Sequence, residues 1–474
     1  MSPDVVVIGA GPAGMAAAIQ AAEFGLSALV LDEQPAPGGQ RFRGIEIAER
    51  RATTNGGALD KDDVHGALIA RRFQESGVAY LAQASVWDVA ADPFEVSYLH
   101  QGSSVSVRPK AIVVATGALE RPVPIPGWML PGVMTAGAAQ LMLKASGRIP
   151  KGRVALLGCG PLLLVAAKQL LDAGADIVAL LQTTTFVDFL RATPNLPSAF
   201  LAPKVLLEGL KLLGCTIGIN AAASLQGARI LGEDRVTGIE YSIGRRTTTL
   251  ECDVVLMHFG VIPNTQITRL VRADHIWSDR QLCWQAMTNA WQETSIPNLM
   301  VVGDGGGIFG ADAAELSGRL SILKIASQRA AIPEAVRDRL AHDLRTKHSR
   351  LARARAFVDV VYRPPEGFLQ PSANVMVCRC EEVMGRDIEA AVANGASGMR
   401  QLKAHTRSGM GPCRGQLCSM ATSAILSGQL GVEFGSLEPA SVRPPLRPLT
   451  LEQLASTKHC HSHVCDFSWN EDPV

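Results

Sequence analysis

The sequence predicts an α/β fold with two parallel sheets, followed by a small helical domain that carries clustered cysteines. Three observations predict this fold. An apolar strand, a glycine-rich turn, an alanine-rich helix and a second apolar strand follow one another between Val5 and Asp32. Much of this succession returns between Val154 and Leu181. Four cysteines then gather late in the chain, between Cys378 and Cys418.

Length and charge narrow the possibilities. With 474 residues the chain is too long for one core, and a prior of about 150 residues per domain gives roughly three domains. The formal net charge is +1, so the global balance does not point to nucleic acid or to an anionic membrane surface. We find no uncharged apolar run of about 18 residues, so no integral membrane segment is expected. The apolar run at the start is interpreted as a strand rather than a signal peptide.

The first glycine-rich turn has the strand–turn–helix context of a dinucleotide-binding fingerprint. Gly9 allows the tight turn, Gly11 lets the backbone approach a pyrophosphate, and Gly14 lets helix and strand pack closely. The N–H groups at the start of the helix favour phosphate. About 20 residues further on, Asp32 is expected to bind ribose hydroxyls, with Glu33 as the alternative acid. The residues predicted to contact the dinucleotide at the turn are Gly9, Gly11, Pro12, Ala13 and Gly14.

Three later stretches fit a flavin dinucleotide, FAD, at the same site. The loop with Gly39 and Gln40 is expected to approach the flavin, although an ordinary surface turn would have the same composition. Thr116-Gly117 ends an apolar strand and looks like the strand that passes beside FAD in flavoproteins with two dinucleotide-binding domains. Gly303-Asp304 also follows an apolar strand, and the acid is expected to receive a ribitol hydroxyl; a helix cap is the alternative.

The second glycine-rich unit departs from the fingerprint. Leu163 stands at the third glycine position, and the second strand ends in Leu181-Gln182-Thr183 without a carboxylate. A leucine there should separate helix from strand, and no acid is placed to hold a ribose. We favour a structural domain without ligand; a bound structural nucleotide and a working NAD(P)H site are the alternatives.

The late cysteines form two close pairs, Cys378-x-Cys380 and Cys413-x4-Cys418. Four thiolates are what a 2Fe–2S cluster requires. Zinc knuckles usually have two to four residues inside each pair, so C-x-C is too tight for the common form. Gly409, Gly411 and Gly415 would let backbone N–H groups approach the sulfurs. A 2Fe–2S cluster is therefore favoured over zinc and over buried thiols without metal.

These motifs carry a specific resemblance. C-x-C-E-x-V followed by T-R-x-G-M-G-x-C-x-G-x-x-C resembles the domain of bacterioferritin-associated ferredoxin. The order of FAD unit, degenerate second unit, FAD return and cysteine domain resembles the A-type (α) subunits of opine oxidases and D-octopine dehydrogenases. It is also similar to the B-type component of hydrogen cyanide synthase and to α subunits of proline or hydroxyproline dehydrogenases. The implied fold is a flavoprotein with two Rossmann-like domains and a small C-terminal 2Fe–2S domain.

The resemblance implies a subunit that relays electrons in a hetero-oligomeric, dye-linked dehydrogenase acting on the C–N bond of an opine, an imino acid or glycine. Catalysis would lie on a D-amino-acid-oxidase-like β subunit, so no catalytic residue is assigned here. A small γ subunit, an FMN at a subunit interface, and a quinone or the respiratory chain as acceptor are further implied components. The expected location is cytoplasmic, or peripheral to a membrane through the complex. The alternative function is a self-contained NAD(P)H-dependent ferredoxin- or rubredoxin-type reductase.

Disulfide-reductase chemistry is not expected. Cys159 lies inside a glycine turn, and Cys215, Cys252 and Cys283 are single. The tail from His459 to Cys465 holds several potential metal ligands, but we favour disorder there.

The expected domain bounds are 1–117 with 275–332 for FAD, 118–274 for the second Rossmann unit, 333–371 for a helical linker with a solvated charged face, 372–432 for the 2Fe–2S domain, and 433–474 for the tail.

Overall fold

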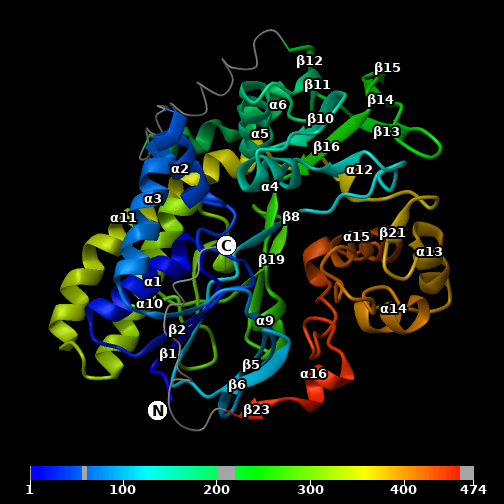
Figure 1. Cartoon of the computed structure of the whole chain (residues 1–474). Coiled ribbons are helices and arrows are strands. Elements are labelled where there is room, and N and C mark those ends of the chain that lie inside the picture. Colours follow the sequence, from blue (N-terminus) through cyan, green and yellow to red (C-terminus); the bar gives the residue numbers. More distant parts are fainter. Residues whose placement is uncertain (1, 56–60, 201–218, 460–474) are drawn as a thin grey trace.

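The computed structural model describes residues 2–55, 61–200 and 219–459 (Figure 1). Its first sheet is parallel and has the strand order β20-β7-β1-β2-β3. Val5, Val6 and Val7 at its centre are completely buried, as expected for a strand covered on both faces. The strands are β1 (Val5–Ile8), β2 (Ala28–Leu31), β3 (Ala79–Leu81), β7 (Ile112–Val114) and β20 (Leu299–Val301).

Helices and an antiparallel meander enclose this sheet. The apolar residues on one side of the sheet pack with α1 and α10, and those on the other side pack with the meander. The strand β23 adds to β6 in parallel, so the last residues that the structure describes return to this domain. The elements are α1 (Pro12–Glu23), α2 (Ile45–Asn55), α3 (Lys61–Glu75), α10 (Ala311–Gln328), β4 (Ser85–Ala91), β5 (Phe94–His100), β6 (Ser103–Val107) and β23 (Lys458–His459).

A second sheet repeats the plan, with the strand order β12-β11-β10-β16-β9. A three-stranded antiparallel sheet, β13-β14-β15, packs beside it. The elements are β9 (Val133–Thr135), α4 (Ala136–Ser146), β10 (Arg153–Cys159), α5 (Pro161–Asp172), β11 (Asp176–Gln182), β12 (Ala221–Ala222), β13 (Gly227–Leu231), β14 (Gly238–Ile243), β15 (Arg246–Glu251) and β16 (Val254–Phe259).

The helix α11 (Glu334–Val361) joins the two halves along one side of the molecule. It packs on α10 of the first half and on α6 (Phe186–Ala192), η1 (Thr193–Asn195) and α7 (Leu196–Ala199) of the second. Ala341 and Leu344 are buried, and the Arg345 guanidinium lies 3.8 Å from the centroid of the Trp291 ring. The sequence analysis expected a solvated charged face on this helix; the structure adds a buried face that packs against both halves.

The C-terminal domain is small and mainly helical. Its core gathers Val377, Ile388, Leu402 and Leu426, all fully buried, next to Cys378 and Cys418. The elements are β21 (Met376–Cys378), β22 (Val383–Met384), α13 (Gly385–Ala393), α14 (Met399–Thr406), α15 (Ser419–Leu430) and η3 (Phe434–Ser436). Before this domain, α12 (Glu366–Leu369) packs through Phe368 on the core of the second half; after it, α16 (Leu451–Ala455) contacts β6 of the first half.

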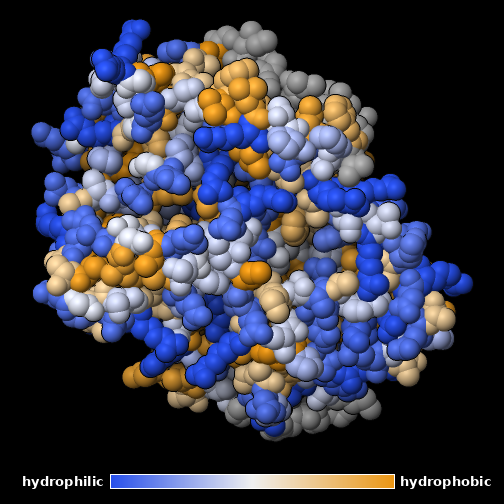
Figure 2. All heavy atoms as spheres, turned by 180° about the vertical axis from the view of Figure 1, so that it is seen from behind, coloured by the Kyte–Doolittle hydropathy of each residue, from blue (hydrophilic) through white to orange (hydrophobic). Residues whose placement is uncertain are grey.

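Within the described ranges, no helix combines the length and apolar character needed to cross a membrane. The rear face of the molecule is a mixed surface, on which hydrophilic residues surround separate hydrophobic groups (Figure 2). The most exposed phenylalanine side chains among the described residues are those of Phe186 and Phe200, at 74% and 64%.

Arg121 lies where the chain crosses between the two halves. Its guanidinium is buried and donates hydrogen bonds to the carbonyls of Phe259, Gln281 and Leu282, at 3.2, 2.7 and 2.8 Å. The elements here are β8 (Ala118–Glu120), β17 (Val261–Pro263), α9 (Gln266–Leu270), β18 (His275–Ser278) and β19 (Cys283–Ala286). The Phe259 carbonyl ends β16 of the second sheet, and the Gln281 and Leu282 carbonyls lie in the turn of the β18–β19 hairpin, which leads back to the first sheet. One side chain thus ties both connections together.

Replacing Arg121 with alanine should lower the free energy of unfolding by roughly 3 kcal/mol, because three buried carbonyls lose their donor. The melting temperature, measured by calorimetry or circular dichroism, checks this. The control is Arg108→Ala, which removes a half-exposed ion pair with Glu95 and should change stability by less than about 1 kcal/mol. Equal shifts for the two variants would contradict the role given to Arg121.

Candidate functional site

The motifs singled out in the first half meet along one edge of the first sheet. Because its strands are parallel and ordered β20-β7-β1-β2-β3, their carboxyl ends lie side by side. The turn of Gly9 to Gly14 follows β1, and Asp32 follows β2 on one side of it. Thr116-Gly117 follows β7, and Gly303-Asp304 follows β20, on the other side. We call this edge the nucleotide groove.

The glycine turn brings helix and strand into contact. A Cβ on Gly14 would lie 1.9 Å from the Gly9 carbonyl oxygen, so no larger residue fits. In contrast, a Cβ on Gly11 would have only the Gly39 Cα, at 3.8 Å, within reach. The space above Gly11 is therefore open to a ligand. Pro12 and Ala13 begin α1, and the Ala13 side chain faces Gly303, where an added Cβ would lie 3.0 Å from it.

The loop after β2 folds back over this turn. The Gly38 N–H donates to the Ala10 carbonyl at 2.8 Å, and a Cβ on Gly39 would lie 2.8 Å from the Gly11 Cα. The Gln40 side-chain amide donates to the Ala118 carbonyl at 3.3 Å, directly after Thr116-Gly117. The loop thus joins the two sides of the groove.

The two acids at the end of β2 have different surroundings. Asp32 is buried and accepts hydrogen bonds from the Ala10 and Gln34 N–H groups, at 3.1 and 3.0 Å. Burial raises the pKa of the Asp32 carboxyl above its ordinary value. Glu33 is half-exposed and forms an ion pair with Arg447 near the C-terminus. Of the two, Asp32 lies against the glycine turn.

The acid after β20 is held by its own loop. Asp304 accepts hydrogen bonds from the Phe309 and Gly310 N–H groups, at 3.0 and 3.2 Å, and burial raises its pKa. It lies in the short helix η2 (Gly303–Gly306). Thr116 donates to the Asn264 carbonyl at 3.4 Å.

Several residues near the groove were missed by the sequence analysis. The Gln281 side-chain amide donates to the Ile308 carbonyl at 2.9 Å and accepts from the Ile308 N–H at 3.1 Å. The same NH₂ group donates to the Asp359 carboxylate of α11 at 2.9 Å. Arg43 pairs with Gln34, its positive charge acts on Asp32, and its Nε is buried without a hydrogen-bond partner among the described atoms. No sequence motif marks these positions, because they act through contacts that only the folded chain creates.

The residues of the groove fit a dinucleotide. The open space above Gly11 suits a pyrophosphate, and the carboxylates of Asp32, which is buried, and Asp304, which is partly buried, follow strands on opposite sides of it. Arg43 adds a buried Nε–H, unpaired among the described atoms, close to Asp32. These are the donor and acceptor positions that the two halves of such a ligand need.

The second glycine turn is built differently. Leu163 is fully buried in the core around α5, so this position serves packing. His258 and Glu120 form a buried pair, with Nδ1 and Oε1 2.7 Å apart. A Cβ on Gly160 would lie 3.1 Å from the His258 Nε2, so the imidazole stands against the turn. The hydroxyl of Thr184, after β11, is buried without a hydrogen-bond partner among the described residues.

The four clustered cysteines come together as two pairs. Cys378 interacts with Cys418 and Cys380 with Cys413, and the first pair is almost completely buried. The mutual interaction of the two thiols lowers the pKa of Cys378 and raises that of Cys418. Backbone N–H groups also point at the sulfurs, from Gly409, Glu381 and Cys380 to Cys378 and from Cys413 to Cys380.

This arrangement fits a 2Fe–2S cluster, in which each of two irons takes two protein thiolates and shares two sulfides. A Cβ on Gly411 would lie 2.2 Å from the Cys380 Cβ, so this loop closes on the thiols only with glycine. Ser408 was missed by the sequence analysis. Its buried hydroxyl lies 3.6 Å from the Cys418 sulfur and 3.1 Å from the Thr422 hydroxyl.

The cysteine domain contacts both halves through aromatic residues. Trp277 of the β18–β19 hairpin packs on Phe434, with ring centroids 4.9 Å apart, and covers Gly435. Trp128 donates to the Met376 carbonyl at 2.8 Å, and the Arg379 guanidinium lies 5.4 Å from its ring centroid. The thiol cluster is therefore docked against the elements that connect the two sheets.

Comparison with known proteins agrees with this architecture. Residues 3–328 match the family described as pyridine nucleotide-disulphide oxidoreductase, and residues 376–427 match the BFD-like [2Fe-2S] binding domain. The A-type subunit of opine oxidase from Agrobacterium tumefaciens (strain Ach5) is 37% identical over 96% of this chain and 92% of its own length. The chain belongs to the pyridine nucleotide-disulphide oxidoreductases and, within them, to the family of opine oxidase A-type subunits. It is an oxidoreductase.

A further relative and a solved structure share this architecture. The hydrogen cyanide synthase subunit HcnB of Pseudomonas protegens is 30% identical over 95% of this chain and 97% of its own length. The crystal structure of L-proline dehydrogenase from P. horikoshii has the same fold, with a TM-score of 0.68 at 16% identity over 96% of this chain and 79% of that one. The predicted fold class, a two-domain flavoprotein fold with a C-terminal 2Fe–2S domain, is confirmed.

Changing Gly11 to valine should lower flavin retention by about ten-fold or more, because the side chain would fill the open space above the turn. The backbone at Gly11 has φ −75°, which valine adopts, so folding should survive. Flavin absorbance per purified chain and the melting temperature check this. Gly398→Ala, at a position with nothing within 4 Å, is the control; full flavin content in Gly11→Val would show that the turn is misassigned.

Changing Ser408 to alanine should lower the reduction potential of the cluster, because a hydrogen bond to a ligand sulfur stabilises the reduced, more negative state. A preference of about 1 kcal/mol corresponds to about 40 mV for one electron. A redox titration followed by electron paramagnetic resonance measures the change. The control Ser427→Ala removes a buried hydroxyl that bonds the Ala424 carbonyl instead. An unchanged potential in Ser408→Ala, or stoichiometric zinc without sulfide in fresh protein, would contradict the assignment.

Proposed function

We propose that this chain is the electron-relay subunit of a hetero-oligomeric dehydrogenase that oxidises a C–N bond. The observation that carries the proposal is the presence, on one chain, of the nucleotide groove and of a four-thiol site docked against the elements that connect the two sheets. A flavin accepts an electron pair and a 2Fe–2S cluster passes electrons singly, so the two together convert one kind of transfer into the other.

In this proposal residues 1–117 and 275–332 hold FAD, residues 118–274 form the second Rossmann unit, and residues 372–432 hold the cluster. The groove residues Gly9 to Gly14, Gly39, Gln40 and Thr116-Gly117 approach the dinucleotide with their backbones. Asp32 receives the ribose hydroxyls and Asp304 a ribitol hydroxyl. Cys378, Cys380, Cys413 and Cys418 ligate the two irons.

Entry of electrons from NAD(P)H is disfavoured by the second unit. Leu163 fills the place where helix and strand approach each other in a working fingerprint. The buried Glu120–His258 pair stands against the turn where a pyrophosphate would lie. β11 ends at Gln182 without a carboxylate for a ribose. A structural nucleotide at this turn would have to lie against His258, and the proposed function does not depend on one.

Thiol chemistry is disfavoured for an independent reason. Burial raises the pKa of Cys159 to about 12, and those of Cys252 and Cys283 to about 11. The thiolate is the reactive form, so these buried thiols are inert near neutral pH. The relay hypothesis therefore needs electrons to enter from another protein.

The names of the relatives indicate what kind of protein would deliver the electrons. Opine oxidase and hydrogen cyanide synthase are named as assemblies with more than one subunit. We propose a partner β subunit of the D-amino-acid-oxidase type that oxidises an opine, an imino acid or glycine. Further components would be an interface FMN and a small γ subunit. A quinone or the respiratory chain would accept the electrons. A self-contained NAD(P)H-dependent reductase is the competing function.

Expressed alone, the chain should pass electrons from a chemical donor to a dye but should not oxidise octopine, nopaline, proline, hydroxyproline or glycine. Co-expressed with its partner flavoprotein, it should support dye-linked oxidation of one of them. Dye reduction with each substrate, with and without the partner, is the measurement. Amine oxidation by the isolated chain would overturn the relay hypothesis, and rapid flavin bleaching by micromolar NADH or NADPH would restore the reductase.

A further inference from the structure

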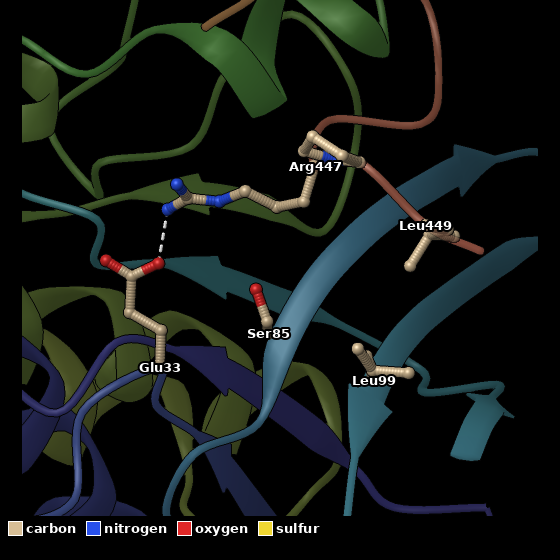
Figure 3. A pocket seen from close by; sticks show the side chains of 6 residues that line it. Glu33, Ser85, Leu99, Arg447 and Leu449 are labelled. Carbon is tan, nitrogen blue, oxygen red and sulfur yellow. Dashed lines mark hydrogen bonds and ion pairs between the residues drawn. The ribbon is translucent and has the colours of Figure 1, made fainter. Parts of the chain in front are cut away.

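A small pocket lies beyond the end of β2, next to the nucleotide groove. It has a volume of about 250 Å³ and is lined by Glu33, Ser85, Leu99, Arg447, Pro448 and Leu449. The Arg447 guanidinium extends across the pocket and forms an ion pair with the Glu33 carboxylate (Figure 3). Glu33 and Arg447 are separated by 414 residues in the chain.

The segment that supplies Arg447 is held against the first half by hydrogen bonds and by a buried side chain. We call residues 440–459 the strap. Arg269 donates to the Ala440 carbonyl, and the Leu446 N–H donates to the Trp87 carbonyl at 2.7 Å. Leu446 is 8% exposed and belongs to the core of the first half. The strap ends as β23 beside β6, with α16 before it (Figure 1).

The strand order of the first sheet indicates which half of a dinucleotide would reach this pocket. A pyrophosphate at the β1 turn lies between β2 on one side and β7 and β20 on the other. The ribitol half must run toward Asp304, which follows β20. The adenosine half must run past Asp32, which follows β2, toward β3.

The chain that follows β3 is already tied to the end of β2. The Asp32 N–H donates to the Leu81 carbonyl at 3.0 Å, and the Ala84 N–H donates to the Asp32 carbonyl at 2.8 Å. Ser85, which follows directly, lines the pocket together with Glu33. The pocket is therefore the continuation of the groove on the adenosine side.

We propose that this pocket receives the adenine ring of FAD and that Arg447, supplied by the strap, lies against the ring. A guanidinium is planar, stacks well on an aromatic face and keeps its hydrogen bond to a carboxylate in its own plane. Leu99 and Leu449 supply the apolar contact that a purine face needs. Glu33 positions Arg447 instead of binding the ribose, which leaves that role to Asp32. The proposal rests on FAD binding as proposed above.

The assignment also connects the two redox domains. The strap begins shortly after η3. Phe434 of η3 packs on Trp277 of the first half, next to the cysteine domain. A ligand that binds the closed strap stabilises it by mass action, so FAD and the docking of the cysteine domain should support each other.

The test compares ligands that carry different halves of FAD. Apo-protein, wild type and Arg447→Ala, is titrated with FAD, ADP and FMN, and flavin fluorescence or calorimetry gives each dissociation constant. Arg447→Ala should raise the constants for FAD and ADP by about five-fold and leave that for FMN unchanged. Glu33→Gln should shift FAD and ADP in the same direction by a smaller factor. The control Leu451→Ala changes a strap residue that is 86% exposed and should have no effect.

The outcomes are distinct. Unchanged FAD and ADP affinity in Arg447→Ala would overturn the inference while leaving the proposed function intact. Equal weakening of FAD, ADP and FMN would show a general structural effect and overturn it as well. A wild-type chain that binds no FAD would overturn the proposed function and the inference together. Melting temperatures of the apo-proteins establish that each variant is folded.

Discussion

The contact between α1 and β1 at Gly14 is the constraint on which the nucleotide groove depends. Any side chain there would meet the Gly9 carbonyl oxygen at 1.9 Å and push the helix outward. The same helix start carries Ala13, against which Gly303 lies after β20. Moving the helix would therefore displace both the N–H groups above the turn and the loop that holds Asp304. A purely local close approach thus fixes the geometry of residues about three hundred positions apart in the chain.

The second half shows what happens when this constraint is released. With Leu163 in place of the glycine, the duplicated unit keeps its sheet and helix but uses the position for its core. The His258 imidazole, paired with Glu120, lies against Gly160 of this turn. Arg121 ties the connections of the duplicated domain to the first half, and α11 packs against both halves.

The sequence predicts the parts of the site that depend on local geometry. Glycine turns between strand and helix, Asp32 at a strand end and the cysteine pairs leave short, recognisable patterns. Residues that act across the chain leave none. The folded chain brings Arg447 into an ion pair with Glu33. It also brings Gln281 into hydrogen bonds with Ile308 and Asp359, and His258 into contact with Glu120. The proline-rich stretch before Leu449 has the composition of a linker, and the sequence predicts no packing for it. In the structure, however, the Leu446 side chain is buried in the core of the first half. Residues 460–465, with the other potential ligands of the tail, lie outside the described part of the chain.

The central claim is that one chain takes electrons at a flavin and passes them to its own cluster. It is tested most directly by photoreducing the flavin of the purified, anaerobic chain with a light pulse, EDTA serving as the electron donor, and following the cluster by rapid-freeze electron paramagnetic resonance. The account predicts that the signal of the reduced cluster grows as the flavin reoxidises, at a rate independent of protein concentration. A cluster that stays oxidised, or one that is reduced at a rate proportional to protein concentration, would contradict it.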